Sequence, residues 1–238
     1  MGLCKKKKAL SQEDFEQQYG RHWIWTAIDP ESKLLISFFI GHRTLEDCKL
    51  FIEDVMARVK TKPLFTSDEL SHYQTTLANK FSYFEEQAKT GKRGRPRIPK
   101  RVVDPDLMYA TVHKTRENGK VVKVEQNIIF GNPEDIFRIL DKSKVSKTIN
   151  TSFIERSNLT LRNHVKNLVR KTICFAKEMQ GLTAQLSIAA TYYNFSKTHS
   201  SLTLKGTDNK KIRRTPAMAA NILDCVWPLE KILAHPMS

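Results

Sequence analysis

Two short apolar runs stand close together near the start of the chain. Residues 22–29 read HWIWTAID and residues 34–41 read LLISFFIG. Both runs are rich in the β-branched and aromatic residues that favour strands. The turn between them, Pro30–Lys33, is about four residues long, so the pair predicts a β-hairpin whose first strand ends at Asp29.

Helical spacing follows the hairpin. Thr44 is a good N-cap for a helix that runs to about Val59, with its apolar residues along one stripe. The run PLFTS predicts a short strand that ends before Asp68, and a mostly polar helix is expected from there to about Gln87. The order strand, strand, helix, strand, helix predicts an α/β fold.

Residues 89–101, KTGKRGRPRIPKR, interrupt this pattern with two Gly, two Pro and seven basic residues. That composition predicts a loop without packed structure. The runs LMYATVHKT and KVVKVEQNIIF then flank Asn118-Gly119, the strongest short signal for a β-hairpin. Helical segments are expected over about residues 133–141 and 152–197, and the tail from Leu202 is basic.

These patterns divide the chain into four segments. A polar extension (1–20) precedes a first core part (21–88), and the basic loop and β-hairpin (89–132) are inserted after it. A second core part (133–238) contains a basic helix and ends in a helical tail.

Charge indicates the kind of partner. The chain has 40 Lys and Arg against 25 Asp and Glu, a formal charge of +15, which favours a polyanion. No apolar run approaches the ~18 residues of a membrane span, and MGLCKKKK lacks the apolar stretch of a signal peptide. Nucleic acid is therefore the expected partner, and no membrane is. The four cysteines form no C-x-x-C pair, which argues against structural zinc and fits reduced thiols in the cytoplasm.

Three carboxylates stand at the ends of predicted elements. Asp29 and Asp68 each follow a strand, and Glu155 opens a helix otherwise loaded with Lys, Arg and Asn. Acids on rigid elements are what two-metal phosphodiester chemistry requires. Each acid also has a local alternative. Asp29 suits hydrogen bonding in a turn, Asp68 suits capping of the next helix, and Ser152-x-x-Glu155 matches a capping box.

A polar stripe follows Glu155 along its helix. At 100° per residue it contains Glu155, Asn158, Arg162, Lys166 and Arg170. A solvated helix face is the usual meaning of such a stripe. Here it begins with an acid and is otherwise neutral or basic, which suits a metal ligand beside phosphate contacts.

An ordered set of motifs resembles a known family across about residues 21–233. The motifs are WIWTAID, SFFIGHRTLED, PLFTSD, GKRGRPR with LMYATV and NGKVVKVE, NTSFIERSNLTLRNHVKNLVRKT, YYNFSKTHSSL and TPAMAANILDCVWPLEKIL. In this order they resemble the DDE transposases of bacterial and archaeal insertion sequences. The resemblance implies an RNase H-like catalytic domain, a mixed sheet flanked by helices.

The resemblance also implies the chemistry. Asp29, Asp68 and Glu155 become the catalytic, metal-binding triad for two Mg²⁺ (or Mn²⁺) ions, and Arg162 is the basic residue seven positions beyond the glutamate. Family members are divalent-metal-dependent polynucleotidyl transferases. They expose a 3′ hydroxyl at the element end and join it to target DNA in a synaptic homo-oligomer, here expected in the cytoplasm at the nucleoid. His199 is expected either to contact phosphate or to be a structural histidine.

Two features depart from the family pattern. Related transposases carry an N-terminal zinc ribbon or helix-turn-helix that binds the element ends. This sequence begins almost at the catalytic core, so a separate or fused module is expected to supply that function. Arg93, Arg95 and Arg97 match the core of an AT-hook, whose arginines enter A·T-rich minor grooves. A loop that grips DNA phosphates without regard to sequence is the favoured interpretation.

Two other functions remain as alternatives to strand transfer. A structure-specific nuclease on the same fold would cut DNA without joining it. A truncated or domesticated copy would only bind DNA or inhibit a full transposase, although three intact acids argue against long decay.

Overall fold

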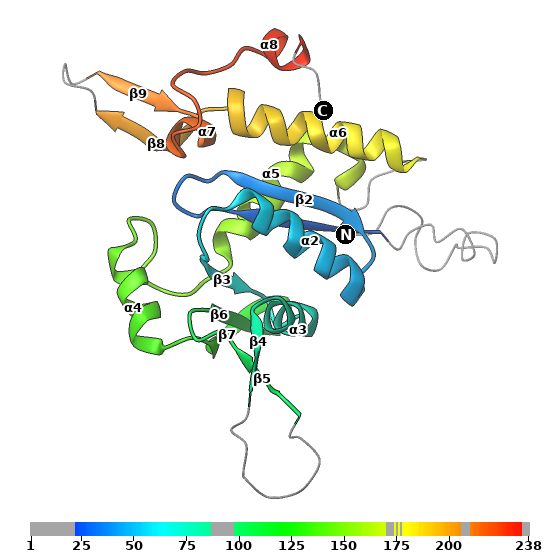
Figure 1. The fold of residues 1–238 in the computed structure, drawn as a ribbon. Helices are drawn as coiled ribbons and strands as arrows, with labels where there is room; N and C mark the ends of the chain where they lie inside the picture. Colours follow the sequence, from blue (N-terminus) through cyan, green and yellow to red (C-terminus); the bar gives the residue numbers. More distant parts are fainter. Residues whose placement is uncertain are drawn as a thin grey trace, which may run out of the picture. The chain divides into compact units, whose positions relative to one another are not determined.

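The computed structural model describes residues 22–86, 98–169, 174, 176, 178–205 and 210–234, and these residues form both α-helices and β-strands (Figure 1). The predicted α/β class is confirmed. The chain forms two compact units: unit 1 contains residues 1–43 and 152–238, and unit 2 contains residues 44–151. The four-segment division predicted above stays a prediction. No helix in the described ranges is long and apolar enough to cross a membrane.

Unit 1 begins with the predicted hairpin. β1 (Trp23–Ile28) and β2 (Leu35–Gly41) pair antiparallel from Trp23↔Gly41 to Ile28↔Leu35. Trp25 is almost fully buried, and its indole N–H donates to the His42 carbonyl at 3.1 Å. Successive side chains of a strand point to opposite faces, so Ile24, Phe38 and Ile40 share the other face of the pair, which is apolar and packs against helices.

The helices of unit 1 cover that face. α5 (Ser152–His164) is followed by the 3₁₀ turn η1 (Lys166–Leu168), and α6 (Met179–Thr191) continues into the π-helical turn η2 (Tyr192–Ser196). The core between helices and hairpin is apolar. It contains buried Val165, Leu168, Leu182, Leu186 and Ala189, with Ile24, Phe38 and Ile40 packed against them.

The prediction of helical structure over residues 152–197 is wrong in one respect: the helix is interrupted after His164. Val165 adopts an extended backbone (φ −117°, ψ 106°) immediately after α5. Its side chain is 2% exposed and lies in the core with Leu168. Burial of these two side chains directs the chain away from the helix axis, and no glycine or proline marks the break.

Asn194 attaches η2 to the hairpin. It is buried, its side-chain N–H donates to the Leu35 carbonyl at 2.9 Å, and its side-chain oxygen accepts from the Leu35 N–H at 3.0 Å. The amide thus bonds to β2 in the way that a neighbouring strand would. It joins residues that are 159 positions apart.

The end of unit 1 contains a hairpin that the sequence pattern did not predict. β8 (His199–Lys205) pairs antiparallel with β9 (Lys211–Arg214). Two short helices follow, α7 (Pro216–Ala219), capped by the Thr215 hydroxyl, and α8 (Leu229–Ala234). The predicted helical tail is therefore present only after Thr215.

Unit 2 combines a three-stranded sheet with helices. α2 (Leu45–Arg58) begins at the predicted cap, where the Thr44 hydroxyl accepts from the Asp47 N–H. β3 (Leu64–Ser67) pairs in parallel with β6 (Met108–Glu117), and β6 pairs antiparallel with β7 (Lys120–Phe130). The predicted strand before Asp68 and the predicted hairpin thus share one mixed sheet.

Local chemistry explains the ends of these strands. Asn118 and Gly119 both have positive φ (49° and 79°), the conformation of a tight two-residue hairpin turn. α4 (Pro133–Lys142) follows with Asn132 as its cap. Ile136 and Leu140 of α4 pack on Ala110 and Val112 of β6.

The helix predicted to about Gln87 is wrong beyond Lys80. α3 (Ser71–Lys80) ends there, and β4 (Ser82–Glu85) pairs with β5 (Lys100–Val103). The Arg101 guanidinium donates to the Ser82 hydroxyl at 2.6 Å and to the Asn79 carbonyl at 2.9 Å. Pairing with a distant strand overrides local helical preference here. Arg93, Arg95 and Arg97 lie outside the described residues.

We expect Asn194→Ala to lower the free energy of unfolding of the chain by about 2–4 kcal/mol, because the buried N–H and C=O of Leu35 both lose this partner. Urea denaturation of the full chain measures the effect. Asn163→Ala, on the exposed side of α5, is the matched control and should change the value by less than about 0.5 kcal/mol. Equal losses for the two variants would contradict the bridging role of Asn194.

Candidate active-site residues

Asp29 shapes the turn that it enters. Its Oδ1 accepts from the Glu31 N–H at 3.2 Å, and its Oδ2 accepts from the Ser32 N–H at 2.9 Å and from the Ser32 hydroxyl. The turn hydrogen bonding considered for Asp29 is therefore present. A carboxylate offers about four acceptor positions, so these bonds leave one open position, on Oδ1. The turn fixes the direction of the carboxylate and leaves room for one more ligand.

Glu155 lies exposed in the first turn of α5. An acid here faces the positive end of the helix dipole, so a helix-end role stays a second prediction beside the metal-ligand role. The helix itself is amphipathic as expected, since Leu161 is 2% exposed and lies in the core of unit 1.

Two contacts join the Asp29 hairpin to the helix of Glu155. The Thr26 hydroxyl of β1 donates to the side-chain oxygen of Asn158 at 2.9 Å. The Lys33 ammonium lies 3.9 Å from the centre of the Phe153 ring. Asp29 and Glu155 therefore stand on directly connected elements of unit 1. Asn158, predicted to contact DNA, uses its amide oxygen to hold α5 on β1, and its contact with DNA stays a prediction.

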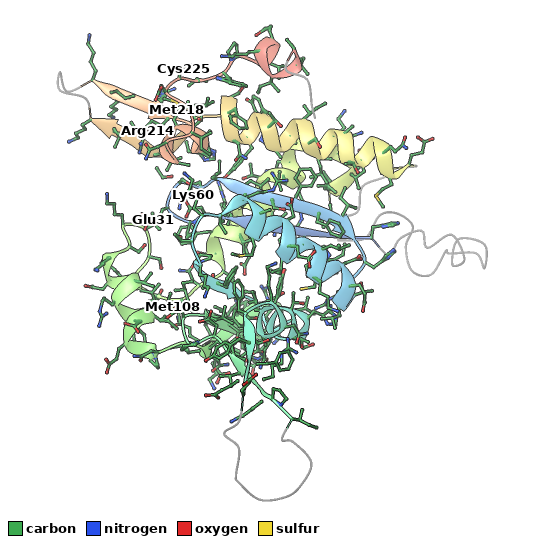
Figure 2. All side chains as sticks on the ribbon, in the orientation of Figure 1. Glu31, Lys60, Met108, Arg214, Met218 and Cys225 are labelled. Atoms are coloured by element: carbon green, nitrogen blue, oxygen red, sulfur yellow. The ribbon has the colours of Figure 1, made fainter. Side chains whose placement is uncertain are left out.

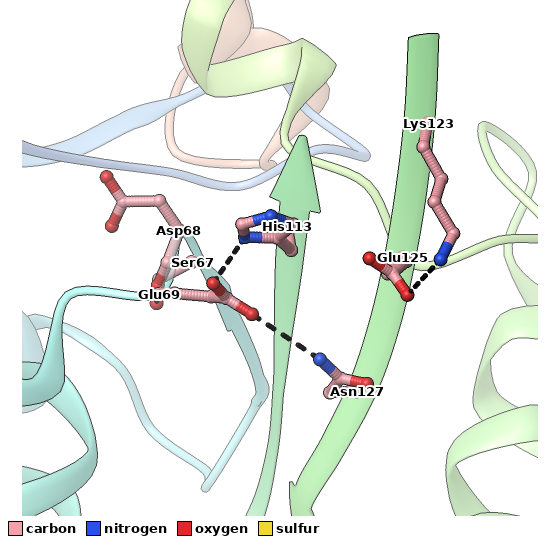
Figure 3. Close-up of polar contacts among 7 residues, drawn as sticks. All are labelled: Ser67, Asp68, Glu69, His113, Lys123, Glu125 and Asn127. Atoms are coloured by element: carbon pink, nitrogen blue, oxygen red, sulfur yellow. Dashed lines mark hydrogen bonds and ion pairs between the residues drawn. The ribbon is translucent and has the colours of Figure 1, made fainter. Parts of the chain in front are cut away.

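Asp68 belongs to unit 2 and follows the last residue of β3. α3 begins at Ser71 and makes no side-chain cap bond, so the capping role considered for Asp68 is excluded. Its carboxylate is exposed, and it makes no hydrogen bond or ion pair with any residue that the structure describes. In Figure 3 it points away from the neighbouring polar cluster.

That cluster, Glu69, His113 and Asn127, was not predicted from the sequence. The Glu69 carboxylate contacts the His113 ring nitrogen at 2.5 Å and accepts from the Asn127 side chain at 3.4 Å (Figure 3). Glu69 follows β3, while the other two residues lie on β6 and β7. Only the strand pairing brings them together, so no local signal could have revealed the cluster.

Tyr109 lies on β6, and its side chain reaches the last residue of β3. Its hydroxyl is 2.8 Å from the Ser67 hydroxyl. Burial raises the pKa of Tyr109 to about 12, and the negative charges of Asp68 and Glu69 act in the same direction. Tyr109 is therefore neutral at physiological pH and supports the strand end as a hydrogen-bonding group.

The predicted basic stripe is shorter than expected. α5 ends at His164, so Lys166 lies in the following 3₁₀ turn and not on the helix. Arg162 is half-buried in the last turn of α5, and Arg170 lies outside the described residues. The stripe on the helix therefore consists of Glu155, Asn158 and Arg162.

His199 packs edge-on against Tyr193, with ring centres 4.9 Å apart. Its Nε2 is buried and has no hydrogen-bond partner among the described residues. Burial lowers the pKa of His199, and the charges of Lys197 and Lys33 lower it further. These surroundings favour a neutral ring in a packing role, and a phosphate contact by His199 stays a prediction.

The candidate triad thus has two acids in unit 1 and one in unit 2. Within the described ranges, no group of three or more His, Cys, Asp or Glu side chains is arranged to hold a metal ion.

Comparison with known proteins adds one finding. Residues 131–194 match the family model of the IS1 transposases. The matched segment contains α4, α5 and α6, and it includes Glu155. No curated protein and no solved structure matches the chain. The family match confirms the resemblance to an insertion-sequence transposase family.

The lowered pKa of His199 predicts a pH dependence of stability. A histidine whose pKa is lower in the folded chain binds protons more readily when unfolded. The free energy of unfolding should therefore be fully maintained above pH 6.5, the ordinary histidine value, and should fall as the pH drops below it. We expect His199→Gln to make this fall shallower, as measured by urea denaturation between pH 8 and pH 5.

His164→Gln is a useful second variant, because burial and Lys197 also lower the pKa of His164. Measurement at about pH 8, where histidine is neutral, separates lost packing from lost titration. If the free energy of unfolding of both variants fell with pH as it does in the wild type, the lowered histidine pKa values would not be the cause of the fall.

Proposed function

We propose that this chain is the catalytic, DNA strand-transfer part of an insertion-sequence transposase, with an RNase H-like fold. In the proposed reaction it hydrolyses a phosphodiester bond at the element end and then joins the 3′ hydroxyl to target DNA. The carrying observation is the position of Glu155. It is exposed at the head of α5, inside the matched segment, on a helix that is bonded to β1, the strand that Asp29 follows.

The donor atoms suit Mg²⁺ or Mn²⁺, which prefer oxygen ligands. Asp29 has one open acceptor position on Oδ1, and Asp68 and Glu155 are exposed carboxylates. Two bound ions would supply activation of the attacking oxygen and stabilisation of the leaving oxygen. Asp29, Asp68 and Glu155 are the residues that would hold these ions.

The remaining residues position these acids and the DNA. The Ser32 hydroxyl and N–H orient the Asp29 carboxylate, and release of the hydroxyl would open a second acceptor position on Oδ2. Thr26 and Asn158 hold the Glu155 helix on β1. Arg162 and Lys166 come after Glu155 along the chain. We assign them to DNA phosphates, which basic side chains typically contact.

DNA is the proposed partner, at both the element ends and the target, with a homo-oligomer in the synaptic complex. A separate or fused N-terminal module would recognise the ends. The mixed pairing of β3, β6 and β7 supports the RNase H-like interpretation. The proposed location is the cytoplasm, at the nucleoid.

The test incubates a pre-cleaved element end, a target plasmid and Mg²⁺ with the full chain. We expect joined product from the wild type. Asp29→Asn, Asp68→Asn and Glu155→Gln should each lower the joining rate at least about a thousandfold, since lost metal stabilisation is worth several kcal/mol and each 1.4 kcal/mol is about tenfold. Glu31→Gln and Glu69→Gln, neighbouring acids outside the triad, are matched controls and should retain activity.

Binding to the same DNA, measured in EDTA, should survive the triad substitutions. No joined product from the wild type, with a verified end sequence present, would contradict the proposal. Cutting of branched DNA without joining would instead indicate a structure-specific nuclease. Binding without any Mg²⁺-dependent product would indicate a copy that only binds or inhibits.

A further inference from the structure

The C-terminal hairpin of unit 1 carries a groove with a volume of about 650 Å³, whose lining includes one apolar residue, Leu204. Three cationic side chains and three hydroxyl side chains contribute to its lining. They are Lys205, Lys211 and Arg213, and Thr198, Ser200 and Thr203. No site residue discussed above lies in this lining.

Within the part of the hairpin that the structure describes, no acidic side chain compensates the positive charges of the groove. Residues 198–205 and 210–214 contain no Asp or Glu. Among the residues that the structure describes, none forms a hydrogen bond or ion pair with the side chains of Lys205, Lys211 or Arg213. Arg214 differs, because its guanidinium donates to the Leu202 carbonyl at 2.9 Å at the base of the hairpin (Figure 2).

The strand register concentrates this charge. Lys205 and Lys211 are direct cross-strand partners, and like charges placed directly opposite each other destabilise a strand pair. Alternation along β9 puts Arg213 on the same face as Lys211. The neighbouring cross-strand pair, Leu204 and Ile212, is apolar and half-exposed. An anion bound between the lysines would relieve it.

We propose that the β8–β9 groove binds the phosphodiester backbone of DNA without reading base sequence. This deepens the function proposed above and rests on it, because DNA is the polyanion on which that function acts. Lys, Arg, Ser and Thr side chains are the usual phosphate contacts. The hairpin strands contain no Phe, Tyr or Trp, the aromatic residues that are enriched in the core of protein interfaces.

The test measures the affinity of the full chain for two unrelated DNA duplexes, in EDTA, between about 50 and 200 mM salt. The variant is Lys205→Ala with Lys211→Ala and Arg213→Ala. Each phosphate contact contributes about 0.9 to the slope of log affinity against log salt. We expect the slope to fall by about 2–3 and the affinity at low salt to fall about tenfold or more, equally for both duplexes.

The matched control removes the same charge elsewhere. Lys49→Ala with Lys120→Ala and Lys142→Ala takes three exposed lysines from unit 2 and should leave the slope near the wild-type value. Lys205→Arg with Lys211→Arg and native Arg213 keeps the charge and should restore binding. In lysine methylation of the wild type, DNA should protect Lys205 and Lys211.

Equal slopes for the groove variant and the control variant would overturn the inference, as would tighter binding of polyglutamate than of DNA. Loss confined to one of the two duplexes would overturn its sequence-independent character. These binding measurements are made without metal ions, whereas the joining reaction requires Mg²⁺. They therefore test the groove even if no joined product forms. A normal groove result with no joined product would contradict the proposed function alone.

Discussion

The double hydrogen bond between the Asn194 amide and the Leu35 backbone is the constraint on which unit 1 depends. It fixes the first residue of β2 to the end of the helical segment, 159 positions away. The turn between β1 and β2 is thereby anchored on its second strand, and the bonds of Asp29 to Ser32 can then set its geometry. The direction of a candidate metal ligand thus follows from a contact made by a residue with no chemical role of its own.

The Asp29 side chain has two roles, one structural and one proposed for catalysis. Its carboxylate closes the turn, and the proposed chemistry requires the same oxygens. A ligand that is already hydrogen-bonded is well oriented, but it has fewer lone pairs to offer. Asp68 represents the opposite arrangement, since its carboxylate is exposed and makes no bond within the described structure. The proposed triad therefore includes one acid that is oriented in advance and one whose carboxylate is bonded to none of the described residues.

Sequence reasoning succeeded where the signal was local. The β1–β2 hairpin, the Thr44 cap and the Asn118-Gly119 turn each depend on residues within a few positions of one another. It failed where pairing is distant. β4 pairs with a strand beyond the basic loop, β3 pairs in parallel with β6, and burial of Val165 ends α5 without any helix-breaking residue. The candidate acids came from their positions at the ends of predicted elements and then from motif order along the chain, whereas the contact of Glu69 with His113, 44 positions away, exists only through the sheet.

The π-helical turn after α6 has a consequence for how this protein can change over evolution. Tyr193 and Asn194 are adjacent in sequence, yet both are buried in η2, one against His199 and the other on Leu35. A π turn contains one residue more than an α turn. Loss or gain of a single residue between 192 and 196 would rotate everything that follows by about 100° relative to α6, separating both contacts at once. The segment should therefore accept changes of residue type on its outer side while keeping its length strictly constant.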